Sequence, residues 1–97
     1  NMRTHTIAGI LTIIAGIIFR LNRWEWLWIL LSIFLVLVME MINTAFENVV
    51  DMVTDFHFHS IGKKIKDMAA GAVLLTACFA IIVGMFIFLP KIYQWIF

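Results

Sequence analysis

Charged residues are scarce in this chain of 97 residues: they make up 13% of the composition, and the formal net charge is only +1. A nucleic-acid-binding protein normally presents a basic face, so this balance argues against a nucleic-acid partner. The single cysteine, Cys78, leaves no possibility of an intrachain disulfide. Apolar residues account for 64% of the sequence, more than a soluble domain of this size could bury. The composition therefore predicts an integral membrane protein.

Familiar phosphate-binding signatures are also missing. The sequence contains neither the GxxxxGK[ST] loop nor the HRD and DFG motifs of soluble kinases. It shows no internal repeat, and the first apolar run lacks a convincing signal-peptide cleavage site. Residues 1–97 are therefore expected to form a single domain, and because the chain begins at Asn1 rather than Met, we expect an N-terminal piece to be missing.

Three apolar runs predict three transmembrane helices per chain, at about residues 4–20, 26–54 and 65–89. Gly62 is expected to break the helix in the second polar connection, and Pro90 to end the third helix. The first run also carries two glycines seven residues apart, which permits close helix contact. These are Gly9 and Gly16.

Aromatic residues and lysines indicate how the helices sit in the bilayer. Three tryptophans follow the first connection and predict an interfacial belt, while Tyr93 and Trp95 are expected to form the opposite belt. The tryptophans are Trp24, Trp26 and Trp28. A weak excess of basic residues around the second connection favours a cytoplasmic position for that loop. Its lysines are Lys63, Lys64 and Lys66.

The most informative stretch is an acidic stripe in the second apolar run. Its members lie at i, i+3, i+7 and i+11, a spacing that brings them to one helical face. They are Glu40, Asn43, Glu47 and Asp51. A carboxylate near the centre of a membrane costs at least ~2.5 kcal/mol and indicates a functional site. The stripe would lie at or near one membrane interface.

Three interpretations of the stripe follow from the residues alone. It could be a polar seam between helices, although carboxylates without matching cations suit that role poorly. It could line a cation or proton pathway through a membrane oligomer. Beside the lysine cluster it could bind Mg²⁺ and nucleotide phosphates, with the deepest carboxylate accepting a proton from a hydroxyl at the membrane surface.

Two motifs carry a resemblance to a known family. One is Glu40-x-x-Asn43-Thr44-Ala45-x-Glu47-x-x-Val50-Asp51, and the other is Lys66-Asp67-x-Ala69-Ala70-Gly71-Ala72-Val73. Together they closely resemble the signature of the prokaryotic diacylglycerol kinases, which are small, trimeric membrane kinases with three spans. The Arg3-x-His5 pair and the Ala69–Ala72 run are most similar to the undecaprenol kinase branch of Gram-positive bacteria.

The resemblance implies an all-α integral membrane fold, a homotrimeric helical bundle in the bacterial plasma membrane with its active site facing the cytoplasm. It implies ATP-dependent phosphorylation of a lipid alcohol with Mg²⁺, the substrate being undecaprenol or, alternatively, diacylglycerol. Compared with the family, this chain is expected to lack the amphipathic surface helix before the first span, and with it an N-terminal acidic residue that helps to bind metal.

The resemblance also assigns roles to individual residues. Glu40 corresponds to the catalytic base, Asn43 helps to position the reacting groups, and Glu47 corresponds to a metal ligand. The nucleotide side is assigned to Asp51, His59, Lys66 and Asp67, with Lys66 holding phosphate. His59 could equally be a loop histidine of no special role, and no role is assigned to His5 or His57.

Overall fold

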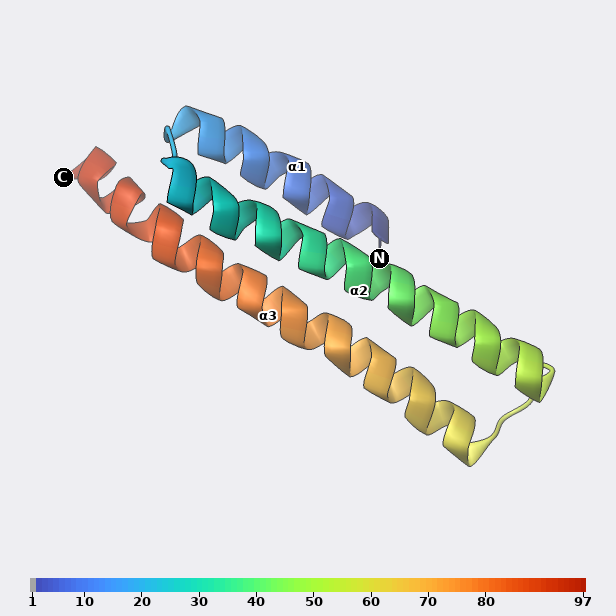
Figure 1. Cartoon of the computed structure of the whole chain (residues 1–97). Coiled ribbons are helices and arrows are strands. Elements are labelled where there is room, and N and C mark those ends of the chain that lie inside the picture. Colours follow the sequence, from blue (N-terminus) through green and yellow to red (C-terminus); the bar gives the residue numbers. More distant parts are fainter. Residues whose placement is uncertain (1) are drawn as a thin grey trace.

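Three helices make up the fold. The computed structural model describes residues 2–97 as α1 (Met2–Ile18), α2 (Arg23–Thr54) and α3 (Ser60–Ile96), with no strand in that range. Helix α2 lies between the others: α1 runs beside its first half, and α3 runs antiparallel along its full length (Figure 1). The molecule measures 56 × 19 × 17 Å. The predicted all-α fold is confirmed.

Two of the three helices are long and apolar enough to cross a membrane. Helices α2 and α3 contain 32 and 37 residues, and at about 1.5 Å of rise per residue α2 alone reaches about 48 Å. Helix α1 is shorter, with 17 residues, or about 26 Å by the same rise. Most of its apolar side chains are exposed, as expected of a helix that faces lipid or another subunit.

The first connection is tighter than the sequence suggested. Helix α1 ends in a left-handed turn at Arg20 (φ 54°), and Leu21 N donates to Gly16 O at 3.1 Å. Helix α2 then begins at Arg23 rather than near residue 26. The reason is a capping box, in which Glu25 N donates to Asn22 Oδ1 and Asn22 N donates to Glu25 Oε1.

Glycines fix the packing of α1 on α2. A Cβ on Gly16 would lie 2.7 Å from Cη2 of Trp26, and one on Gly9 would lie 3.3 Å from Cγ2 of Ile33. Both glycines are buried, so the predicted close contact at these two positions is confirmed. It sets the register that carries the start of α1 alongside the middle of α2.

The second connection corrects the predicted start of the third helix. Asp55 and Phe56 adopt left-handed conformations (φ 52° and 60°) and reverse the chain. His59 then caps α3, because its Nδ1 accepts from Ile61 N at 3.1 Å. Helix α3 therefore begins at Ser60, not near residue 65. Gly62 is the buried contact of its first turn, with Val50 Cγ1 only 3.0 Å from an added Cβ, so the prediction that it breaks the helix is wrong.

The far end of α3 differs from the prediction as well. The helix continues through Pro90 to Ile96, because a proline in a membrane helix removes one backbone hydrogen bond without forcing the chain to stop. The prediction of an opposite aromatic belt is wrong too. The ring of Trp95 lies 5.7 Å from that of Phe19, and the C-terminal end of α3 lies at the same end of the bundle as the start of α2 (Figure 1).

Candidate active site

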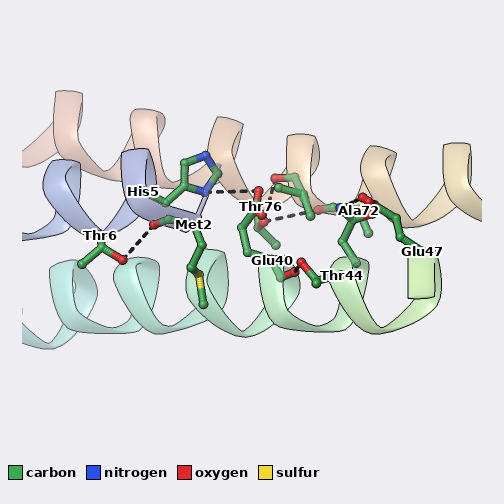
Figure 2. Close-up of polar contacts among 10 residues, drawn as sticks. Met2, His5, Thr6, Glu40, Thr44, Glu47, Ala72 and Thr76 are labelled. Atoms are coloured by element: carbon green, nitrogen blue, oxygen red, sulfur yellow. Dashed lines mark hydrogen bonds and ion pairs between the residues drawn. The ribbon is translucent and has the colours of Figure 1, made fainter. Parts of the chain in front are cut away.

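Glu40 is the deepest member of the stripe on α2. Only 5% of its surface is exposed, although Glu, like other charged residues, is almost never fully buried unless paired. Its Oε1 lies 3.6 Å from Nδ1 of His5 on α1. Figure 2 shows His5, Glu40 and Thr76 together in the layer between the three helices. The carboxylate thus faces the interior of the bundle rather than the acyl chains.

One turn further along α2, two members of the stripe bind each other. Asn43 Nδ2 donates to Glu47 Oε1 at 2.8 Å. The other atom of the amide, Oδ1 of Asn43, is buried, and no described residue donates to it. Glu47 itself is exposed. This pair therefore presents carboxylate oxygens to solvent beside an acceptor that has no donor, which is a suitable arrangement for a hard cation.

At the loop end, a cleft of about 440 Å³ opens between α2, α3 and the connection between them. All four residues assigned to the nucleotide side line it. They are Asp51, His59, Lys66 and Asp67. Lys66 Nζ donates across the helices to Asp51 Oδ1 at 2.6 Å, and Lys63 Nζ donates to Asp67 Oδ2 at 2.7 Å.

The three parts of the stripe lie at different depths. Counting about 1.5 Å per residue from Trp28 in the aromatic belt, Glu40 lies about 18 Å along the axis and Glu47 about 28 Å. Asp51 lies about 34 Å along, beyond a hydrocarbon core of about 30 Å. The stripe therefore extends from within the hydrocarbon depth to the water beyond the loop end.

A second hollow begins at His5, the residue that lies 3.6 Å from Glu40. It is an apolar groove of about 380 Å³ that separates α1 from α3 and is floored by α2. His5 lines it, and small residues such as Gly9, Ala77 and Ala80 keep it open. No group of three or more His, Cys, Asp or Glu side chains with metal-binding geometry occurs within residues 2–97.

Comparison with known proteins agrees with this geometry. The family described as prokaryotic diacylglycerol kinase matches residues 1–88, a range that contains both sequence motifs. The chain belongs to the prokaryotic diacylglycerol kinase family. The resemblance inferred from the two motifs is thereby confirmed, and the protein is a membrane lipid kinase that uses ATP.

Individual relatives carry two names. An undecaprenol kinase of Bacillus subtilis is 41% identical over 95% of this chain and 74% of its own length. A diacylglycerol kinase of Synechocystis is 40% identical over the same share of the chain and 53% of its own length. A diacylglycerol kinase of Helicobacter pylori is 44% identical over 57% of the chain and 42% of its own length. The first two identities are too similar to separate the two lipid substrates.

Sequence reasoning assigned no role to His5, which the structure places 3.6 Å from Glu40. The signal that could have found it is the register of the first hairpin. In the antiparallel pair of α1 and α2, Gly16 lies opposite Trp26 and Gly9 lies opposite Ile33. Continued along both helices, this register brings His5 close to the turn of α2 that ends at Glu40. Such a register needs knowledge of which glycines touch α2, and spacing along the chain alone does not supply it.

Proposed function

We propose that this kinase transfers the γ-phosphoryl group of ATP directly to the hydroxyl of undecaprenol. The proposal is supported by the placement of two features along α2. The buried carboxylate of Glu40 lies within the hydrocarbon depth, and the lysine-lined cleft lies at the loop end. The groove that His5 lines has apolar walls, which suit the hydrocarbon chain of a lipid alcohol. ATP would enter the cleft from water, and the two substrates would meet along the stripe.

The proposed step is an in-line displacement. The lipid hydroxyl oxygen bonds to the γ-phosphorus, the bond from that phosphorus to the bridging oxygen breaks, and ADP leaves with the electron pair. Glu40 accepts the hydroxyl proton, and Asn43 helps to position the reacting groups. Catalysis by such a site depends on orientation and on neutralising the phosphate charge, because the protein forms no covalent intermediate.

The cleft supplies the nucleotide contacts in this proposal. Lys66 binds phosphate as a point charge, and Asp51 keeps its ammonium group in place through the bond of 2.6 Å. His59 and Asp67 line the same wall. Because the Nδ1 of His59 already caps α3, only its Nε2 edge is available to a nucleotide.

Mg²⁺ fits the oxygen atoms that the stripe offers. Glu47 supplies an exposed carboxylate, and Asn43 Oδ1 is a buried acceptor to which no described residue donates. Mg²⁺ commonly binds through one or two carboxylates plus phosphate oxygens and water. When bound, the ion supplies neutralisation of the triphosphate charge.

A homotrimer with its loop end in the cytoplasm completes the proposal. Outside its contacts with α1 and α3, α2 exposes large apolar side chains, among them Phe34, Met41 and Phe46. A second copy of the chain can cover such a surface. Native mass spectrometry in detergent should give three subunits per particle, and a monomer that is fully active would contradict the trimer.

Phosphorylation assays with both lipids test the substrate assignment. Purified protein in one detergent would receive ATP with either undecaprenol or diacylglycerol at equal mole fraction. We expect the higher kcat/KM with undecaprenol. Equal or greater turnover of diacylglycerol would instead assign the diacylglycerol kinase reaction. A protein that phosphorylates neither lipid yet conducts cations in liposomes would overturn the kinase mechanism at this site.

A further inference from the structure

His5 has an unusual position for a side chain with no part in the proposed reaction. It lies on α1, yet its side chain reaches the interior of the bundle and is only 23% exposed. Its Nδ1 is fully buried and has no hydrogen-bond partner among the described residues. A buried polar nitrogen without a partner is costly. The atom nearest to satisfying it is Oε1 of Glu40, at 3.6 Å.

Glu40 has the complementary deficiency. Its side chain is 6% exposed, and within residues 2–97 no lysine or arginine forms an ion pair with it. A carboxylate in this environment needs a donor. Figure 2 shows His5 as the side chain that α1 directs toward it. The separation is only slightly longer than a hydrogen bond, and catalytic contacts often tighten when substrate binds.

We infer that His5 is the positioning residue of the catalytic base, because its Nδ1–H donates to Oε1 of Glu40 and leaves Oε2 to accept the proton of the lipid alcohol. The inference rests on the proposed role of Glu40 as the base. It gives α1 a function in the reaction through His5. The His5 side chain does not line the nucleotide cleft, and Glu40 is the stripe residue that it approaches. His5 also lines the apolar groove, so the oriented carboxylate lies where a chain in that groove would end.

The chemistry of the donor dictates the test. The amide nitrogen of asparagine lies the same number of bonds from Cα as Nδ1 of histidine, whereas that of glutamine lies one bond further. His5→Asn should therefore retain most of the wild-type kcat. His5→Leu, which removes the donor, should lower kcat by about ten- to a hundredfold, the usual effect of losing a hydrogen bond to a charged group. His5→Gln should fall between them. The KM for ATP should stay constant in all three variants, because the cleft is remote from Glu40.

The control variant is Thr6→Val on the same helix. The Thr6 hydroxyl is exposed and donates only to the backbone, at Met2 O, so its loss should leave kcat unchanged. Size-exclusion profiles in detergent check that each variant is folded. If His5→Leu does not fold, the inference is still tested by whether the kcat of His5→Asn exceeds that of His5→Gln. Equal activity of the Asn and Gln variants, wild-type activity of His5→Leu, or a parallel rise in the KM for ATP would overturn the inference.

A Glu40→Gln variant separates this inference from the proposed function. If Glu40→Gln is inactive and His5→Leu is fully active, only the role of His5 fails. If Glu40→Gln retains activity, the base assignment itself fails, and the role of His5 fails with it. If both variants are impaired, the double variant with Glu40→Gln and His5→Leu should be no slower than Glu40→Gln alone, because His5 acts only through that carboxylate. A further loss in the double variant would contradict that mechanism.

Discussion

The two ends of the bundle are built differently. At the end where α1 joins α2, a cluster of buried apolar residues packs beneath aromatic rings. The cluster consists of Leu21, Ile29, Val83 and Ile87, with Phe19 edge-on to Phe88 at 5.9 Å. At the loop end, Val50 and Gly62 are the buried contacts, and the rest of the space is a cleft lined by charged side chains. One end holds the helices together, and the other leaves them far enough apart to admit a ligand.

Ion pairs show the same contrast. At the packed end Lys91 Nζ lies 3.0 Å from Glu25 Oε1, and Glu25 is also part of the cap of α2. That pair also joins α2 to α3, but its carboxylate is already held by the cap of α2. At the loop end the pair of Asp51 and Lys66 is the cross-helix polar contact of the cleft wall. The Lys66 ammonium group can exchange part of its contact with Asp51 for phosphate, whereas Lys91 pairs with a carboxylate that the cap of α2 already holds.

The largest expected effect comes from Glu40, at the buried end of the stripe and between the two ends of the bundle. Glu40→Gln should lower kcat by about 10²–10⁴-fold, the range for loss of a general base, while ATP still binds. Glu47→Gln should instead weaken binding of Mg²⁺-ATP, because it removes a cation ligand. Turnover assays together with titration of a non-hydrolysable ATP analogue measure both quantities. Equal loss of nucleotide affinity in the two variants would show that the stripe is not divided by depth.

A smaller effect is expected from the loop end alone. Lys66→Gln should raise the KM for ATP by about tenfold or more, because it removes a charged hydrogen-bond donor and leaves Asp51 repelling the incoming phosphates. Lys64→Gln is the matched control. Lys64 is exposed, and it lies outside the lining of the cleft. Steady-state kinetics at saturating lipid distinguish the two, and identical KM values would remove Lys66 from the phosphate site.

The sequence predicts more of the loop end than of the packed end. The spacing of Glu40, Asn43, Glu47 and Asp51 follows from helical periodicity, and one reversal of the chain is enough to bring Lys66 near Asp51. The nucleotide-side residues could therefore be grouped from sequence. The roles given to them remain proposals, because the motif supplies them and the cleft supplies only their proximity.

The parts that sequence reasoning missed depend on local three-dimensional contacts. The start of α3 at Ser60 depends on the His59 side chain folding back onto Ile61 N. The contact of His5 with Glu40 depends on the register of α1 against α2. A proline such as Pro90 is normally read as the end of a helix, and only the surrounding structure reveals that the helix continues. Periodicity along the chain contains none of this information.

The smallest effect on activity is expected at the packed end, where the change should appear in stability instead. Gly16→Ala forces a Cβ to within 2.7 Å of Trp26 and 3.0 Å of Leu21, and such overpacking typically costs about 1–3 kcal/mol. Gly71→Ala is the matched control, because nothing lies within 4 Å of its added Cβ. There the higher helix propensity of alanine should give a gain of up to about 1 kcal/mol.

Thermal unfolding in detergent measures the difference in stability between Gly16→Ala and Gly71→Ala. Steady-state kinetics on the folded fraction then measure the KM for ATP of each variant. Gly16 of α1 packs against Trp26 near the start of α2, whereas the cleft lies at the other end of α2. The KM for ATP should therefore be the same in Gly16→Ala and Gly71→Ala. A destabilised Gly16→Ala with an unchanged KM would mean that the packed end supports the fold without setting the shape of the cleft. A KM that rises together with the loss of stability would show instead that α2 transmits a disturbance along its whole length, and the two ends could then no longer be treated as separate regions.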